Sequence, residues 1–304
     1  MAESDYEIID TRFARLPCMM ANVHKLYDQC HWAEGPAYFP AGRYLIWSDA
    51  PNDRMLRYDE CNGALSTFRQ PSNNSNGNTV DRQGRLVSCK HGSRRVTRTE
   101  IDGSITVIAD NYRGKRLNSP NDVVVKSDGS IWFTDPTYGI DSDYEGNRGE
   151  SEIDASYVFR VDPAIAAIEV VCDDFVKPNG LAFSPDESLL YVVDTGRTHG
   201  AQNPAYMRVF EVDGQSKLSG GDVFADSTVG LFDGFRLDEA GRIWTSAADG
   251  VHVYDPDGTL IGKVRVPETV ANVCFGGPKR NRLYMCGTTS LYAVSLFVNG
   301  AATF

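Results

Sequence analysis

The chain has 304 residues, 41% of them hydrophobic, which is enough for one large domain with a sizeable core. Its 30 lysine and arginine residues against 41 aspartate and glutamate residues give a formal net charge of −11, which argues against nucleic acid and anionic membranes as partners. No apolar run approaches the ~18 residues that span a bilayer. The first residues, Met1–Asp5, lack the basic region and apolar core of an export signal. We therefore expect a cytoplasmic protein.

The cysteines support a reducing compartment. They are odd in number, scattered, and without a CxxC or zinc-binding spacing, at positions Cys18, Cys30, Cys61, Cys89, Cys172, Cys274 and Cys286. We expect reduced thiols that fill a core.

A short pattern recurs six times along the chain. Each copy begins with a polar residue, and in four copies a glycine follows eight residues later and leads into an apolar run; Glu34, Gly42 and Tyr44–Trp47 are the first example. The six starting residues are Glu34, Asn76, Asn121, Asn179, Asp233 and Asn272. They are 42, 45, 58, 54 and 39 residues apart, a spacing typical of propeller blades.

Within each copy the apolar runs are short, rich in Val, Ile, Tyr and Trp, and separated by turn residues, so each copy predicts a meander of strands. One such sheet cannot cover both of its apolar faces, whereas radial stacking covers them all. We predict an all-β fold, a six-bladed β-propeller with four-stranded antiparallel blades around a central metal-binding channel. It forms a single domain over residues 1–304, with blades that start near 34, 76, 121, 179, 233 and 272. Tyr6–Asp10 resembles a strand, and the N-terminal segment is expected to supply the outer strand of the last blade.

The starting residues form a ring in this fold, because equivalent positions on the innermost strands lie at one height. All six carry a side-chain carboxylate or carbonyl oxygen. Asn and Asp also favour strand ends and turns, which is the alternative explanation. Six oxygen donors without imidazole or thiolate suit a hard divalent cation, and calcium is favoured because it accepts irregular oxygen shells.

Several segments between the repeats are expected at one mouth of the channel. Residues 71–78 form a polar stretch, and His91 lies fifteen residues after Asn76, at the end of a second strand; a surface histidine is the alternative. Insertions at 140–156 and 195–204 each follow the second strand of their unit, so both should project over the same mouth.

The motifs resemble those of the gluconolactonase and regucalcin (senescence marker protein) family. The resemblance rests on Ala33–Pro36, Ser119–Asp122, Lys177–Asp186 and Phe232–Gly234, which occur in the family's order. It is greatest with the bacterial gluconolactonases, through Asn118–Val123 and Asp135–Gly139.

The resemblance implies a six-bladed propeller that hydrolyses lactones with calcium or another divalent metal. It implies metal ligation by Glu34, Asn179 and Asp233, with Asn121 beside the metal and near the substrate. One departure is Ser119, where the animal regucalcins carry a substrate-binding arginine; Lys115 and Arg116 lie nearby in sequence.

We therefore expect one Ca²⁺, replaceable in vitro by Mg²⁺, Mn²⁺ or Zn²⁺, and a gluconolactonase that converts glucono-1,5-lactone to gluconate in carbohydrate metabolism. Asp233 is the candidate catalytic base, and a metal-bound hydroxide is the alternative, since a carboxylate bound to a cation is less basic. The candidate substrate-binding residues are Asn121, Asn118, Arg116, Tyr138, Asn76 and His91, a polar set suited to sugar hydroxyls.

Other functions remain open at this stage. The same calcium propeller could hydrolyse phosphotriesters or other lactones, or serve as a non-catalytic binding module, because fold alone does not decide function. A binding module predicts a filled channel top, whereas Gly35, Gly180 and Gly234, which follow ring residues, indicate open space there. The expected partner is a small lactone, and the chain is expected to be a monomer or a homodimer.

Overall fold

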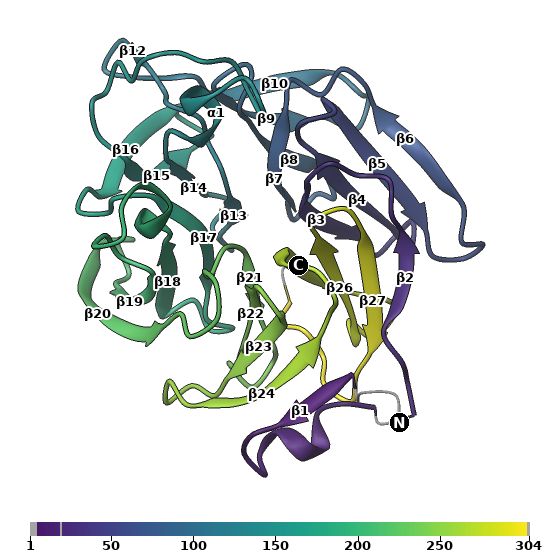
Figure 1. Cartoon of the computed structure of the whole chain (residues 1–304). Helices are drawn as coiled ribbons and strands as arrows, with labels where there is room; N and C mark the ends of the chain where they lie inside the picture. The colour runs from purple at the N-terminus through teal and green to yellow at the C-terminus, as the bar shows by residue number, and fades with distance from the viewer. Residues whose placement is uncertain (1–4, 19, 303–304) are drawn as a thin grey trace.

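In a computed structural model of the chain, which describes residues 5–18 and 20–302, six antiparallel sheets are arranged radially around a central axis (Figure 1). The prediction of a six-bladed β-propeller with four-stranded blades is confirmed. In blades 1 to 4 the first strand in sequence is innermost, and the chain then runs outward by antiparallel hairpins. Blades 5 and 6 follow the same order from their innermost strands, and each then gains an N-terminal strand on its outer edge.

The blades contain the following strands. Blade 1 has β3 (Ala33–Phe39), β4 (Tyr44–Asp49), β5 (Arg54–Asp59) and β6 (Leu65–Arg69); blade 2 has β7 (Ser75–Val80), β8 (Leu86–Lys90), β9 (Arg95–Thr99) and β10 (Ile105–Ala109). Blade 3 has β13 (Val123–Val125), β14 (Ile131–Asp135), β15 (Tyr157–Asp162) and β16 (Ala167–Cys172); blade 4 has β17 (Pro178–Phe183), β18 (Leu189–Asp194), β19 (Tyr206–Val212) and β20 (Leu218–Asp226). Blade 5 has β21 (Phe235–Leu237), β22 (Ile243–Ala247), β23 (Gly250–Tyr254), β24 (Leu260–Arg265) and β1 (Tyr6–Ile8); blade 6 has β25 (Val270–Gly276), β26 (Arg282–Gly287), β27 (Leu291–Ser295) and β2 (His24–Tyr27).

The remaining elements are short. They are the hairpin of β11 (Asn111–Tyr112) and β12 (Lys115–Arg116), the helix α1 (Tyr138–Asp141), and the 3₁₀ turns η1 (Phe13–Arg15) and η2 (Gly196–His199). No helix in the described part of the chain is long and apolar enough to cross a membrane.

The hydrophobic core lies between neighbouring blades rather than in one central layer. The second strand of each blade is buried on both faces, as in β14 and β22, which carry the fully buried Trp132 and Trp244. Trp244 packs with Val273 and Met285 of the next blade in one apolar cluster. This inter-blade packing explains why the second strands are continuous apolar runs.

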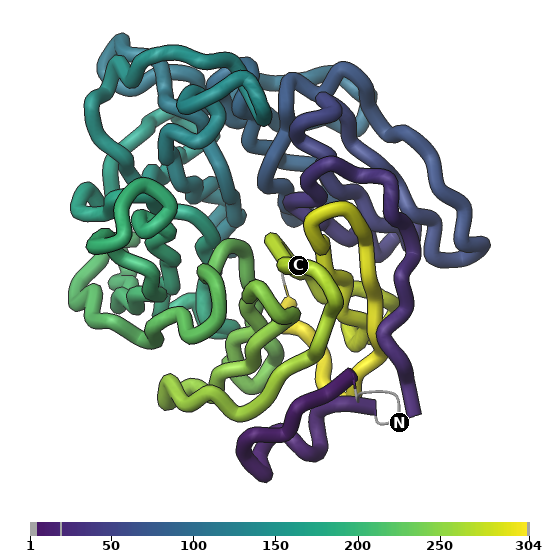
Figure 2. The backbone as a smooth tube through the Cα atoms, in the orientation of Figure 1, coloured from purple at the N-terminus to yellow at the C-terminus, as the bar shows by residue number. Residues whose placement is uncertain are grey.

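The N-terminal segment supplies outer strands to two blades, and not only to the last blade as predicted. β2 pairs with β27 as the outer strand of blade 6, so the first and last parts of the chain share one sheet (Figure 2). The strand at Tyr6–Ile8 instead pairs with β24 and adds a fifth strand to blade 5. Phe13, which follows it, is fully buried against Gly262 of β24. Residues 1–4, to which we assigned no export signal, lie outside the described residues.

Candidate functional site

The six starting residues of the repeat lie within the first three residues of the innermost strands, or two residues before them in the case of Asn121 and Asp233. Adjacent members are joined by short contacts around the axis. The Gly77 N–H donates to the Asn121 carbonyl at 2.8 Å, and the Gly180 N–H donates to the Asp233 carbonyl at 3.2 Å. Between blades 6 and 1, Asn272 Nδ2 donates to Glu34 Oε2 at 3.1 Å, which closes the ring.

The glycines that follow ring residues have a packing role that the sequence analysis misinterpreted. We expected Gly35, Gly180 and Gly234 to leave open space. A Cβ atom on Gly180 would instead lie 2.1 Å from the Asp233 carbonyl oxygen, and one on Gly35 would lie 2.1 Å from that of Asn76. The glycines therefore let neighbouring inner strands approach closely, and the ring is narrow.

Glu34 and Asp233 place two carboxyl groups close together in this ring. Glu34 is 3% exposed, and burial, with the charge of Asp122 second, raises its pKa to about 8. Burial also raises the pKa of Asp233 well above its ordinary value, and the nearby Glu34 carboxylate adds to the rise. A hydrogen bond from the Asn179 side chain opposes it. The structure thus brings Glu34, Asn179 and Asp233 within electrostatic reach of one another.

Buried aspartates at the ends of second strands fix the segments that lead into the ring. Asp135, at the end of β14, accepts hydrogen bonds from the backbone N–H groups of Asn118 and Ser119 at 2.8 and 2.9 Å. Asp194, at the end of β18, accepts 2.9 and 3.0 Å bonds from Val176 and Lys177. Each aspartate therefore helps to hold a ring asparagine, Asn121 or Asn179, in place.

The two insertions meet each other near the ring. His199 Nε2 lies 2.9 Å from Asp141 Oδ2, and the Tyr138 hydroxyl lies 2.6 Å from Thr195 Oγ1. Burial raises the pKa of Tyr138, and the Asp233 carboxylate contributes to the rise, which places the phenol near the ring. Lys177 Nζ lies 3.4 Å from Asp141 Oδ2 and 5.4 Å from the centre of the Tyr138 ring. Lys177 is a charged group at this mouth that the sequence analysis did not single out.

Glu145, from the first insertion, is a further carboxylate at the mouth that was missed. Its charge contributes to the raised pKa values of both Glu34 and Asp233. Burial, with Asp141 second, raises its own pKa to about 7. The only signal in the sequence was its position in an insertion rich in acidic residues, which does not distinguish it from its neighbours.

His91 lies beneath this loop rather than on the surface. Its side chain is fully buried, Nδ1 is 3.2 Å from the Glu145 carbonyl, and Nε2 has no hydrogen-bond partner among the described residues. Burial lowers the pKa of His91 to about 4, so its imidazole is neutral at pH 7. A Cβ on Gly139 would lie 2.4 Å from His91 Cβ, so the histidine packs tightly against α1.

The other predicted substrate-binding residues differ in their accessibility. Asn118 is fully buried, and its amide donates to the carbonyls of Asp135 and Ala155 and accepts from Ser151 Oγ. Arg116 is exposed on the β11–β12 hairpin, where its backbone N–H binds Glu152. Asn121 and Asn76 are buried members of the ring.

The ring offers oxygen atoms to a ligand. The Asn76 Oδ1 atom is buried without a hydrogen-bond partner in the described part of the chain, and two carboxyl groups lie nearby on other ring members. Buried polar atoms normally have partners. The donor set of carboxylate and amide oxygens fits a hard divalent cation.

Comparison with known proteins identifies the family. Residues 32–289 match the family described as "SMP-30/Gluconolactonase/LRE-like region". The chain is 30% identical to a gluconolactonase of Zymomonas mobilis over 84% of this chain and 76% of the relative. It is 31% identical to the pentonolactonase XacC of Haloferax volcanii, over 84% of this chain and 81% of the relative.

Solved structures agree. A gluconolactonase of Xanthomonas campestris is 38% identical and superposes with a TM-score of 0.89, covering 96% of this chain and 94% of that one. A structure described as a putative gluconolactonase is 39% identical, with a TM-score of 0.91 over 98% of this chain and 99% of the other. The chain belongs to the SMP-30/gluconolactonase/LRE-like family, and within it to the lactone-hydrolysing enzymes.

Proposed function

We propose that this protein is a metal-dependent sugar lactonase, a gluconolactonase that opens glucono-1,5-lactone to gluconate. The observation that carries the proposal is the pair of buried acidic ring members, Glu34 and Asp233, which lie close enough for the Glu34 carboxylate to raise the pKa of Asp233. Relatives named as lactonases of sugar acids, including a pentonolactonase and a 6-deoxy-6-sulfogluconolactonase, support the substrate class.

We propose that Glu34, Asn179 and Asp233 hold a divalent cation, with Asn121 beside it, and that the cation is Ca²⁺. Two carboxylates would neutralise a divalent charge, and an all-oxygen donor set is the one that calcium prefers. A regucalcin from Agrobacterium tumefaciens, described as a calcium-binding protein, shares the fold at 19% identity and a TM-score of 0.74. When bound, such a cation supplies a Lewis acid for the lactone carbonyl.

The residues of the chain would then carry out ester hydrolysis. In this proposal a water oxygen attacks the carbonyl carbon while the Asp233 carboxylate accepts the proton of that water. The bond from the carbonyl carbon to the ring oxygen breaks, and the ring oxygen takes the proton that Asp233 had accepted to become the hydroxyl of the product acid. General-base assistance of this kind contributes roughly 10²- to 10⁴-fold.

Recognition of a polyhydroxylated substrate fits the side chains around the ring. Asn121, Asn76 and Tyr138 offer amide and phenol groups at this end of the channel, and we propose that they contact substrate hydroxyls. Asn118 is better suited to holding the loop, because its amide is fully bonded within the protein. His91 packs beneath the loop, and Arg116 stands on an exposed hairpin.

The test compares kcat/KM for four substrates at fixed calcium: glucono-1,5-lactone, unsubstituted δ-valerolactone, an acyl-homoserine lactone and a phosphotriester. We expect the sugar lactone to be fastest, because a site built for hydroxyls loses binding when they are absent. Faster turnover of the phosphotriester or the acyl lactone would overturn the substrate class. No turnover of any of them in a calcium-loaded sample would favour a binding module.

We also propose the cellular compartment in which the protein acts. Cysteines in the described residues are all free thiols, with Cys30, Cys89, Cys274 and Cys286 buried. This fits a reducing compartment, and we propose the cytoplasm. The expected partner is the lactone itself.

A further inference from the structure

A cavity lies in the channel, beyond the ring. Its volume is about 360 Å³, which falls within the range of small-molecule sites. The residues that line it follow the ring residues along all six inner strands, as Pro36–Tyr38 follow Glu34 and Arg236–Leu237 follow Asp233. All six strands run in the same direction along the channel, and three residues of strand advance by ~10 Å. The cavity is therefore at the end of the channel opposite the ring.

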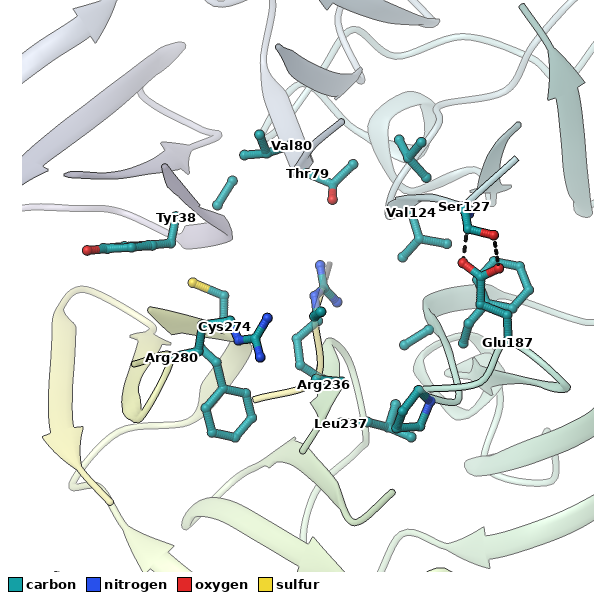
Figure 3. Close-up of a pocket in the computed structure, with 18 of the residues that line it drawn as sticks. Tyr38, Thr79, Val80, Val124, Ser127, Glu187, Arg236, Leu237, Cys274 and Arg280 are labelled. Carbon is teal, nitrogen blue, oxygen red and sulfur yellow. Dashed lines mark hydrogen bonds between the residues drawn. The ribbon is translucent and has the colours of Figure 1, made fainter. Parts of the chain in front are cut away.

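Arg236 is the polar group in the middle of this cavity (Figure 3). The residue is 8% exposed, and its Nη1 atom donates to the Phe235 carbonyl at 2.6 Å and lies 3.5 Å from Asp122 Oδ2. Both contacts use one nitrogen, whereas a guanidinium carries five N–H donors. Within residues 5–18 and 20–302, Nε and Nη2 make no hydrogen bond to the protein, so both retain donors for a ligand in the cavity.

The other charged groups of the lining, including Arg82, have partners in the protein. Arg280 is 39% exposed at the edge and binds Glu239 at 2.6 Å. Glu187 binds the Ser127 hydroxyl and lies 3.2 Å from Lys126 Nζ, and Asp186 accepts hydrogen bonds from Ser184 and Ser188. A buried arginine that keeps free donors, in a cavity whose acidic groups are already engaged, favours an anion.

Apolar atoms make up somewhat more than half of the wall around Arg236. Val80, Val124, Leu237 and Phe275 line the cavity, and the C-terminal residues 301–302 form part of one side. The Ala301 N–H donates to the Leu237 carbonyl at 2.9 Å, so this wall is tied to β21. Such a lining suits an apolar body and gives few partners to a polyhydroxylated sugar acid.

We propose that this cavity is a second binding site, separate from the ring, for an apolar monocarboxylate, whose carboxylate accepts hydrogen bonds from Arg236 and whose hydrocarbon body contacts the apolar walls. Arginine forms two parallel hydrogen bonds with a carboxylate, which gives both orientation and affinity. The proposal is independent of lactone hydrolysis.

The experiment uses 4-tert-butylbenzoate as the probe, with isothermal titration calorimetry on the full chain. We expect saturable binding, at least tenfold weaker binding of the neutral 4-tert-butylbenzamide, and weaker binding of gluconate. Arg236→Gln should weaken the benzoate at least tenfold, because a hydrogen bond between charged groups is lost. Arg265→Gln, which removes an exposed arginine paired with Glu7 on the outer side of blade 5, is the matched control and should bind normally.

A second variant covers the case in which Arg236→Gln fails to fold because Asp122 loses its partner. Thr79 of β7 points into the cavity (Figure 3), and Thr79→Phe would fill the space while leaving Arg236 and Asp122 intact. We expect this variant to lose benzoate binding. Normal binding by folded Thr79→Phe, equal binding of acid and amide, or no saturable binding at millimolar probe would each overturn the proposal.

Discussion

Asp233 has two proposed roles, as a cation ligand and as the base, and one substitution tests both. Asp233→Asn keeps the shape of the side chain but removes a negative charge and the proton acceptor. We expect a folded protein whose kcat for glucono-1,5-lactone falls by ~10²-fold or more. The measurement is steady-state kinetics at saturating calcium, with circular dichroism to check the fold.

The matched control is Asp222→Asn, since Asp222 is exposed on β20, away from the inner strands. It should retain normal kinetics. Near-normal turnover of Asp233→Asn with calcium saturated would remove the aspartate from both roles.

His91 should make the protein less stable in acid. Burial lowers its pKa to about 4, from ~6.5 in an unfolded chain, with Glu145 and Asp141 as the acidic groups facing it. The unfolded state therefore binds more protons between these values. The stability associated with neutral His91 is present above pH ~6.5 and is lost as the pH falls toward 4.

We expect His91→Asn to lose less of its unfolding free energy than the unchanged protein does between pH 7 and pH 5. Urea denaturation at several pH values measures this difference. The contributions of buried carboxyl groups such as Asp135 to the pH dependence cancel, because both proteins carry these groups. Identical pH profiles would mean that His91 is protonated or accessible in the folded state.

At the scale of elements, the close approach of inner strands predicts the effect of a single methyl group. Gly180→Ala would put Cβ 2.1 Å from the Asp233 carbonyl oxygen, a backbone atom that cannot rotate away. We expect a loss of about 1–3 kcal/mol in the free energy of unfolding, together with reduced lactonase activity because β17 is pushed away from Asp233.

Gly214→Ala is the control, since a Cβ there meets nothing within 4 Å and Gly214 does not require a positive φ. Thermal melts and kinetics on both variants provide the comparison. If Gly180→Ala were as stable and as active as Gly214→Ala, the inner strands would be more loosely packed than the structure indicates.

At the scale of the whole molecule, the N-terminal segment should contribute more through β2 than through β1. β2 supplies the fourth strand of blade 6, whereas β1 is a fifth strand on a blade that already has four. Deleting residues 1–28 should lower the melting temperature by about 5 °C or more, because it leaves β27 as an open edge. Deleting residues 1–9 should cost less. Equal melting temperatures for the two deletions would show that β2 does not hold the ring closed.

The architecture could be predicted from local patterns in the chain, because repeated short apolar runs at blade spacing have few ways to bury both faces of each sheet. The sequence also located the polar residue at the head of each repeat, and the contacts Gly77–Asn121 and Asn272–Glu34 put those residues side by side. The strand at Tyr6–Ile8 was predicted, but its position in blade 5 was not, because the sequence of a three-residue strand does not indicate which strand it pairs with.

The surroundings of the ring residues depend on the three-dimensional packing of the blades and could not be predicted from local patterns. We interpreted Gly180 as a sign of open space in the channel, but in the structure it allows close contact with the segment that carries Asp233. Asn118 looked free for substrate, but its partners Ala155 and Ser151 lie more than thirty positions along the chain. Glu145, His91 and Arg236 owe their environments to burial and to charges from other blades. These are long-range properties, which local sequence patterns do not encode because they depend on how separate blades are brought together.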